Sequence, residues 1–143
     1  MHGQRHDCPG HLRERPDGND VILCATVDAD ATVDGLGGDD TIAVAGSVNG
    51  TVSAGAGMDH LSVFASGSVS GVVVGDGGDG DGGDGDDHIT VAGVVTSSGD
   101  ILGGAGNDFL LVGVNNGLVN GGDSSDYCRV ASGNGPVGFE YPL

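Results

Sequence analysis

Aspartates recur along this chain at a spacing that would stack their carboxylates. Six stretches fit the frame G-G-x-G-x-D-x-U, in which U is an apolar residue. The sixth-position residues of these stretches are Asp20, Asp40, Asp59, Asp87, Asp108 and Asp126. They are 20, 19, 28, 21 and 18 residues apart, so four spacings lie near 20 and one is longer by about nine. Because carboxylate oxygens are hard ligands that suit divalent cations such as Ca²⁺, a repeat of this kind predicts a row of cation sites.

The six copies differ in how completely they match the frame. Residues 82–89 (GGDGDDHI) and 103–110 (GGAGNDFL) match in full. Three further copies each lack one glycine, and the first copy is degenerate; these are 35–42, 54–61, 121–128 and 15–22. The first, second and fourth positions are expected to form turns, where positive φ angles are cheap only for Gly. Successive amides and carbonyls in such turns can point toward one ion.

The elements that must position these turns are short strands. Each Asp is followed by apolar residues two apart, which face the same side of a strand. A second turn follows, such as Ser-Val-Asn-Gly at 47–50, and then a second apolar strand. One coil is therefore turn, strand, turn, strand, and stacked coils would form two parallel sheets across a thin Val/Ile/Leu core. No coil buries its apolar face alone, so stacking is obligatory. The prediction is an all-β solenoid of about six coils.

The frame resembles the hemolysin-type calcium-binding repeat, the RTX nonapeptide, whose fold is a right-handed parallel β-roll. The resemblance covers residues 15–130. It implies Ca²⁺ ions between neighbouring turns on one edge, held by sixth-position Asp carboxylates and by backbone carbonyls of the Gly-rich turns. The carboxylate ligands would be Asp40, Asp59, Asp87 and Asp108, with Asp20 and Asp126 at the ends. The glycines of the implied sites are Gly35, Gly38, Gly57, Gly82, Gly83, Gly85, Gly103, Gly104, Gly106, Gly121 and Gly122.

The sequence departs from the family pattern at two features. Many members carry nonapeptides on both edges, whereas here the second turn is of the Ser/Asn-Gly type, so we expect ions on one edge only. Residues 75–83 (GDGGDGDGG) form a nine-residue excess that carries Asp76, Asp79 and Asp81. Two interpretations stay open for this segment, an accessory ion site or replication slippage in Gly-Asp codons.

The sequence divides into a predicted flexible polar tail at 1–14, the calcium-binding roll at 15–137 and a C-terminal tail at 138–143. The N-terminal tail contains His2, His6, Cys8 and His11, which are soft-metal ligands or simply polar tail residues. It has no apolar stretch of the length that a secretory signal needs. The RTX resemblance nevertheless implies a secreted, extracellular protein of bacterial type.

Charge excludes several classes of partner. The net charge is −17, and residues 16–143 contain 19 acids but a single Lys or Arg, Arg129. Such a chain repels nucleic acid and anionic membranes, and no apolar run approaches the ~20 residues of a membrane helix. We therefore expect no nucleic-acid partner and no membrane insertion.

Two other groups of residues could carry chemistry. His60 and His88 share the seventh frame position and should stack on the outer face, as a metal or ligand site or as a solvated pair. Cys24 and Cys128 fall on inward positions of the first and last coils. Five coil steps separate them by about 24 Å, too far for a disulfide, so both are interpreted as small buried apolar residues. Cys8 reaches Cys24 only if the tail folds back over the first coil.

These observations predict a non-enzymatic, calcium-dependent β-roll with a structural or binding role, which folds when Ca²⁺ neutralises its acids. No catalytic motif is present. Two alternatives stay open. One is an accessory module of a secreted enzyme, because RTX rolls often follow one. The other is a solenoid that recognises glycans or ice, although its outward column lacks a regular Thr array.

Overall fold

The computed structural model describes residues 4–5, 11–13, 18–64, 67–75, 85–138 and 141–142. All regular structure in these ranges is β-strand, and every strand pair is parallel. The strands stack as a parallel β-solenoid of about five turns, which confirms the predicted fold class. Among the described residues there is no helix long and apolar enough to cross a membrane.

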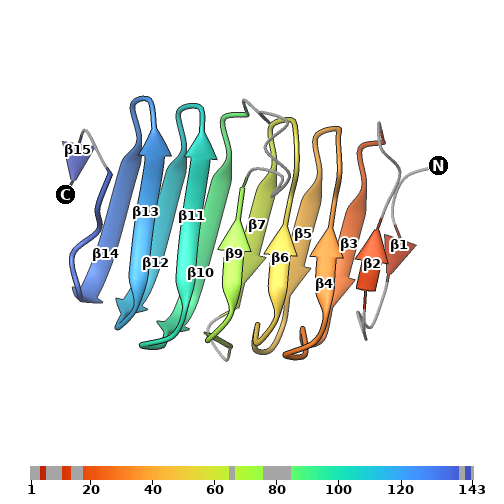
Figure 1. Cartoon of the computed structure of the whole chain (residues 1–143), viewed down its shortest axis with the longest axis horizontal. Coiled ribbons are helices and arrows are strands. Elements are labelled where there is room, and N and C mark those ends of the chain that lie inside the picture. Colours follow the sequence, from red (N-terminus) through yellow and green to blue (C-terminus); the bar gives the residue numbers. More distant parts are fainter. Residues whose placement is uncertain are drawn as a thin grey trace.

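Each coil gives one strand to each of two facing sheets (Figure 1). The main strands of the first sheet are β3 (Val21–Cys24), β5 (Thr41–Val44), β7 (His60–Val63), β10 (His88–Val95), β12 (Phe109–Asn115) and β14 (Tyr127–Gly133). Those of the second are β4 (Thr32–Asp34), β6 (Thr51–Ser53), β9 (Val72–Val74), β11 (Asp100–Ala105) and β13 (Leu118–Asp123). The short β8 (Ser68–Val69) pairs with the end of β10. These main strands make five coils with a strand in both sheets, and β14 begins another.

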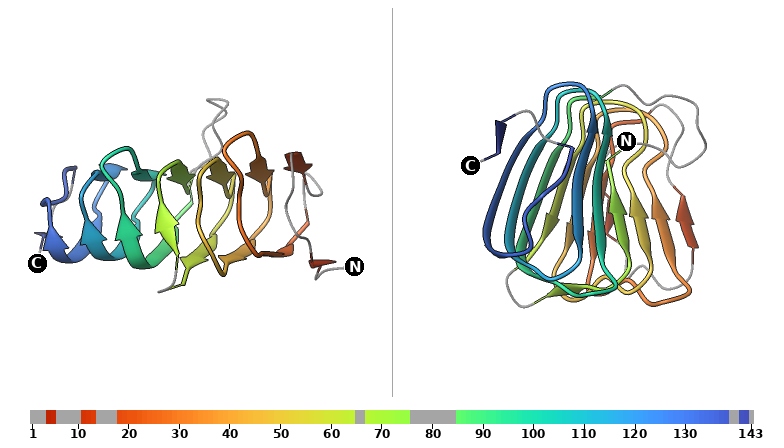
Figure 2. Two further views of the ribbon diagram at one scale, coloured as in Figure 1. Left: turned by 90° about the horizontal axis from the view of Figure 1, so that it is seen from below. Right: turned by 60° about the vertical axis from the view of Figure 1, so that its left-hand side comes forward.

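The core is a thin layer between the two sheets, which face each other across the solenoid (Figure 2). Strands alternate buried and outward residues, and like residues stack in register, as in Ile22↔Ile42 and Ile42↔Leu61. The inward residue that follows each sixth-position Asp by two is almost fully buried; these are Ile22, Ile42, Leu61, Ile89, Leu110 and Cys128. Burying each large aliphatic side chain contributes about 1.5–3 kcal/mol, which the coils obtain only by stacking.

The second turn forms the opposite edge and is held by small side chains. Val27, Val48 and Val69 are buried and bridge to one another along the axis. Outside them, the Ser70 hydroxyl donates to Asn49 Oδ1 at 2.7 Å. The fifth coil has Asn115 at this edge, fully buried; its Nδ2 donates to the carbonyl of Asn134 and its Oδ1 accepts the Gly117 N–H, both at 3.0 Å. This edge therefore satisfies its polar groups without a carboxylate row.

Both ends of the solenoid continue into segments that the sequence analysis placed in tails. At the N-terminal end, β1 (Gln4–Arg5) pairs with β3 and β2 (His11–Arg13) pairs with β4. At the C-terminal end, β15 (Tyr141–Pro142) pairs with β14. Parallel pairing thus continues on both sides of the predicted boundaries at 15 and 137. Strands of two or three residues are too short for an alternating pattern to reveal them.

The two described cysteines differ in state. Cys128 is a free, fully buried thiol, as its inward frame position predicts. Cys24 is also buried but is disulfide-bonded, and its partner lies outside the described residues. The interpretation of Cys24 as only a small apolar side chain is therefore wrong, because its position in the first coil leaves it next to an additional chain segment.

Candidate metal centre

The six sixth-position aspartates form one buried column along the first-turn edge. Each is only 1–2 % exposed. The backbone N–H of each Asp except the last, Asp126, donates to Oδ1 of the Asp on the next coil. The N···Oδ1 distances are 2.8 Å for Asp20 to Asp40, 2.7 Å for Asp40 to Asp59, 2.9 Å for Asp59 to Asp87, 2.9 Å for Asp87 to Asp108 and 2.8 Å for Asp108 to Asp126. The structure thus brings together all six carboxylates that the repeat singled out.

The turn backbone explains how these carboxylates come to lie inside the turn. In the copies 35–42, 54–61, 103–110 and 121–128, the residues at the second and fourth frame positions have positive φ, for example 105° at Gly104 and 109° at Gly106. Leu36 (φ 75°) and Ser124 (φ 86°) hold the same conformation without being glycine. At the first position most copies need space, since a Cβ on Gly103 would lie 2.5 Å from Asp108 Oδ2; the copy 54–61 has Ala54 there. The frame therefore combines two backbone reversals with one close approach to the carboxylate.

The coil that contains Asp87 starts its turn earlier than the sequence match suggested. The Gly75 N–H donates to the carbonyl of Leu102 at 2.9 Å, as the Ala54 N–H does to Val74 at 3.1 Å. A Cβ on Gly75 would collide with Asp87 Oδ2, as one on Gly103 would with Asp108. Gly75 therefore takes the first position that the frame assigned to Gly82.

Several residues of the predicted sites cannot be placed. Gly82 and Gly83 lie outside the described residues, as do Asp76, Asp79 and Asp81 of the proposed accessory site. The soft-metal candidates His2, His6 and Cys8 lie outside them as well. Of His11 only the backbone is described, in β2.

The electrostatics of the column favour neutralisation. Burial raises the pKa of Asp40 from 3.8 to about 7; repulsion by Asp59, Asp20 and Asp39 adds to this effect, and the hydrogen bond from the Asp20 N–H opposes it. The Oδ2 atoms of Asp20 and Asp40 are buried and have no hydrogen-bond partner. Burying ionised carboxylates is costly unless they are paired or coordinate metals. Either bound cations or protons would offset this cost.

The carboxylates are arranged in line and not in clusters. Within the described parts of the chain, no three His, Cys, Asp or Glu side chains gather closely enough to hold a metal ion. Adjacent coils offer two column carboxylates at a time, so an ion between them would take its remaining ligands from turn carbonyls. All of these donors are oxygens, which is the donor set of Ca²⁺ and Mg²⁺.

A second row of side chains, at the fifth frame position, was missed by the sequence analysis. The Asp39 N–H donates to Asn19 Oδ1 at 2.8 Å and the Met58 N–H to Asp39 Oδ1 at 3.0 Å. The Asn107 N–H likewise donates to Asp86 Oδ1 at 2.9 Å. The signal was present, because Asn or Asp occupies this position in four of the six copies. The two rows satisfy turn N–H groups, which cannot bind a cation, so the backbone donors for an ion would be turn carbonyls, some of which also accept hydrogen bonds from the next coil.

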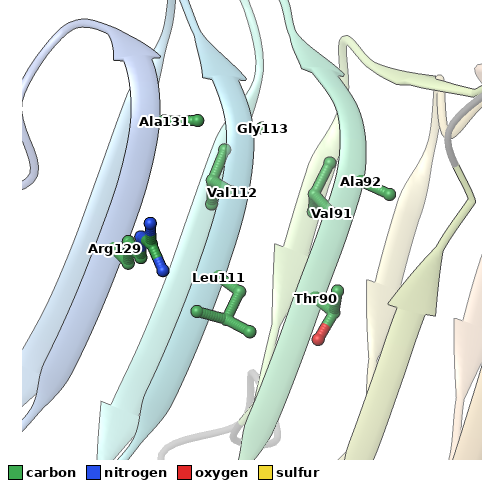
Figure 3. A pocket seen from close by; sticks show the side chains of 8 residues that line it. All are labelled: Thr90, Val91, Ala92, Leu111, Val112, Gly113, Arg129 and Ala131. Atoms are coloured by element: carbon green, nitrogen blue, oxygen red, sulfur yellow. The ribbon is translucent and has the colours of Figure 1, made fainter.

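The outer face of the first sheet has a shallow groove of about 220 Å³, lined in part by Thr90, Leu111 and Arg129 (Figure 3). Its lining contains no carboxylate, histidine or cysteine. The groove therefore offers no acid and base pair for catalysis.

Comparison with known proteins returns no match. No protein-family model matches the chain, and no curated protein or solved structure is significantly similar to it.

Proposed function

We propose that this protein is a calcium-binding β-solenoid whose ions lie along the Asp column between adjacent coils. The observation that carries the proposal is the column itself, in which six buried carboxylates repeat from coil to coil. The only Arg or Lys in residues 16–143, Arg129, is exposed on β14. The carboxylates and the turn carbonyls would hold the ions, and the resemblance of the frame to the RTX repeat supports the same assignment.

Calcium fits this donor set better than magnesium does. Ca²⁺ accepts six to eight oxygens in flexible geometry, whereas Mg²⁺ demands a near-ideal octahedron and retains its waters. A turn built from backbone carbonyls and shared carboxylates provides many oxygens without octahedral order. We therefore expect Mg²⁺ to be a poor substitute.

The role of the ions would be to stabilise the fold. Residues 16–143 contain 19 acids and one Arg, and self-repulsion of this size opposes a compact state. Because the column exists only when coils stack, the free energy of binding becomes free energy of folding. Such coupling suits an extracellular protein, since calcium is millimolar there and scarce in cytosol. We propose a structural or binding role of this kind, with an accessory module of a secreted enzyme as the alternative.

Circular dichroism with and without Ca²⁺ tests the proposal. In chelator the far-UV spectrum should be that of largely unfolded chain, and Ca²⁺ should produce a β signal with a cooperative titration. The same concentration of Mg²⁺ serves as the control and should have little effect. Identical β spectra in chelator and in calcium would show that folding does not need the ion.

A second candidate function is supported by the hydrogen bonds of the column. Oδ1 of five of the six aspartates accepts a backbone N–H, so the same ladder can serve an ion-independent structural solenoid neutralised by protons. The β signal in chelator separates the two candidates. A solenoid that needs calcium to fold gives no β signal in chelator. An ion-independent solenoid gives a β signal there, and a stronger one at low pH.

A further inference from the structure

The outward face of the first sheet differs in composition from the rest of the molecule. In a chain with 21 acids, the outward positions of β3, β5, β7, β10, β12 and β14 contain no Asp or Glu. One column on this face carries rings over four consecutive coils; it consists of Val21, Thr41, His60, His88, Phe109 and Tyr127. The acids are concentrated elsewhere, so this face presents aromatic and imidazole rings where the rest of the molecule presents carboxylates.

Two histidines occupy directly paired positions within this column. His88 of β10 is the register partner of His60 of β7. Their ring centroids are 4.7 Å apart, and the rings are stacked at 27°. Phe109 packs on the other side of His88, also at 4.7 Å, and stacks in turn on Tyr127. His88 is thus held between two rings, while His60 is exposed.

This geometry suits a metal ion that prefers nitrogen. A metal bonds imidazole nitrogen at about 2.0–2.1 Å, so two nitrogens about 4 Å apart or closer can share one ion. The ring centroids are 4.7 Å apart, and imidazole binds a metal through a lone pair in its ring plane, so the exposed His60 ring has to turn out of the stack for both nitrogens to reach one ion. Imidazole suits Cu²⁺, Ni²⁺ and Zn²⁺, and Cu²⁺ binds tightest of the three.

We propose that His60 and His88 form a two-histidine site for a divalent transition-metal ion on the outer face of the first sheet. The site is separate from the Asp column. Asp59 and Asp87, the residues that precede the two histidines, are buried and lie on the opposite side of their strands. The face thus offers imidazole nitrogen and the turn edge offers oxygen, so the two sites select different ions. Water completes the coordination of the outer ion.

Copper titration of the full chain tests this assignment. The chain has five histidines, so replacing His2, His6 and His11 with Ala leaves only the two of interest. The protein is kept in Ca²⁺, and its fold is checked by circular dichroism. Electron paramagnetic resonance then counts the imidazole nitrogens bound to Cu²⁺, and we expect two.

Single and double variants in this background give the expected pattern. His60→Asn or His88→Asn should leave one bound imidazole and weaken Cu²⁺ binding at least about tenfold, because losing even an outer-shell partner costs 10–100-fold. The double variant should bind no copper through imidazole. Thr41→Ala, beside His60 in the same column, is the matched control and should match the background protein.

A bound imidazole count below two in the background protein would overturn the proposal, as would equal copper affinity in the double variant. Either result would mean that His60 and His88 only pack in a row with Phe109 and Tyr127 and do not bind a metal ion together. The test requires a folded solenoid but does not depend on calcium being bound in the column. If the chain folds in chelator, the same copper result is expected there, so failure of the calcium proposal stays distinguishable.

Discussion

Replacing Asp87 with Asn should move calcium-free stability and calcium affinity in opposite directions. Oδ1 of Asp87 accepts the Asp59 N–H, and the Asp87 N–H donates to Asp108 Oδ1, both at 2.9 Å. Asn keeps both hydrogen bonds but removes the charge. Without calcium, this change relieves repulsion from two neighbouring carboxylates. With calcium, it removes a charged ligand shared by the two inter-coil sites on either side.

The size of the effect follows from the spacing of the column. At a separation of about 4.8 Å and an effective dielectric constant of about 20, each ionised neighbour repels Asp87 by about 3 kcal/mol. Protons taken up by the column relieve part of this repulsion, so we expect Asp87→Asn to raise the free energy of unfolding in chelator by about 1–3 kcal/mol. The midpoint of calcium-induced folding should rise at least about tenfold, with lower cooperativity.

The fraction of folded chain in chelator, brought into range with a stabilising osmolyte, and calcium titration, both followed by circular dichroism, measure the two effects. Asp87→Ala also loses the acceptor of the Asp59 N–H and should be less stable than Asp87→Asn by about 1–3 kcal/mol. Asp100→Asn is the control, because Asp100 pairs with Val72 and Leu118 in the second sheet and lies outside the column. A lone surface charge is worth little, so it should change neither quantity.

Equal calcium shifts for Asp87→Asn and Asp100→Asn would refute the reasoning, since the acids would then act as diffuse charge and not as a row of ligands. A loss of stability in chelator for Asp87→Asn would refute the electrostatic part, because the buried charge would then be stabilising the column.

Three further predictions concern pH, backbone strain and the buried thiol. The folded chain raises the pKa of Asp40 from 3.8 to about 7, so the folded state binds the proton more tightly than the unfolded one. In chelator the contribution of Asp40 should be complete below about pH 4 and be lost as the pH rises through about 7. The β signal of the folded chain in chelator, followed by circular dichroism from pH 8 to 4, should grow as the pH falls, and Asp40→Asn should flatten this dependence. Ser124→Gly should stabilise the protein by about 1 kcal/mol in thermal unfolding. The reason is that Ser124 is exposed with φ 86°, and left-handed backbone costs a non-glycine residue about 1–2 kcal/mol. Gly57 has φ 128°, so Gly57→Ala should destabilise the protein. Burial raises the pKa of the Cys128 thiol to about 12, so alkylation at pH 8 should be slow in the folded protein and fast in urea; fast alkylation without urea would mean that the last coil opens readily.

The sequence by itself determined the repeat, the strands and the Asp column. In a solenoid each coil contacts only its neighbours, so a spacing near 20 residues fixes which side chains stack on which. The alternation of apolar residues fixes the inward face, and two glycine positions in each turn fix where the backbone takes positive φ. For this reason Asp40, Asp59 and Asp108 could be assigned to one column without any structure.

Other features were decided only by the stacking of coils. The sequence has glycines on both sides of the long insertion, and only pairing with Ala54 and Gly103 selects Gly75 as the first residue of its turn. The end strands β1, β2 and β15 are too short to carry a pattern of their own, and no local pattern around Cys24 reveals that it is disulfide-bonded. The ring contacts of His60 and His88 likewise depend on rotamers, which neighbouring side chains set. Local pattern fixes register in this fold, but contacts between segments far apart in the chain form only once the coils have stacked.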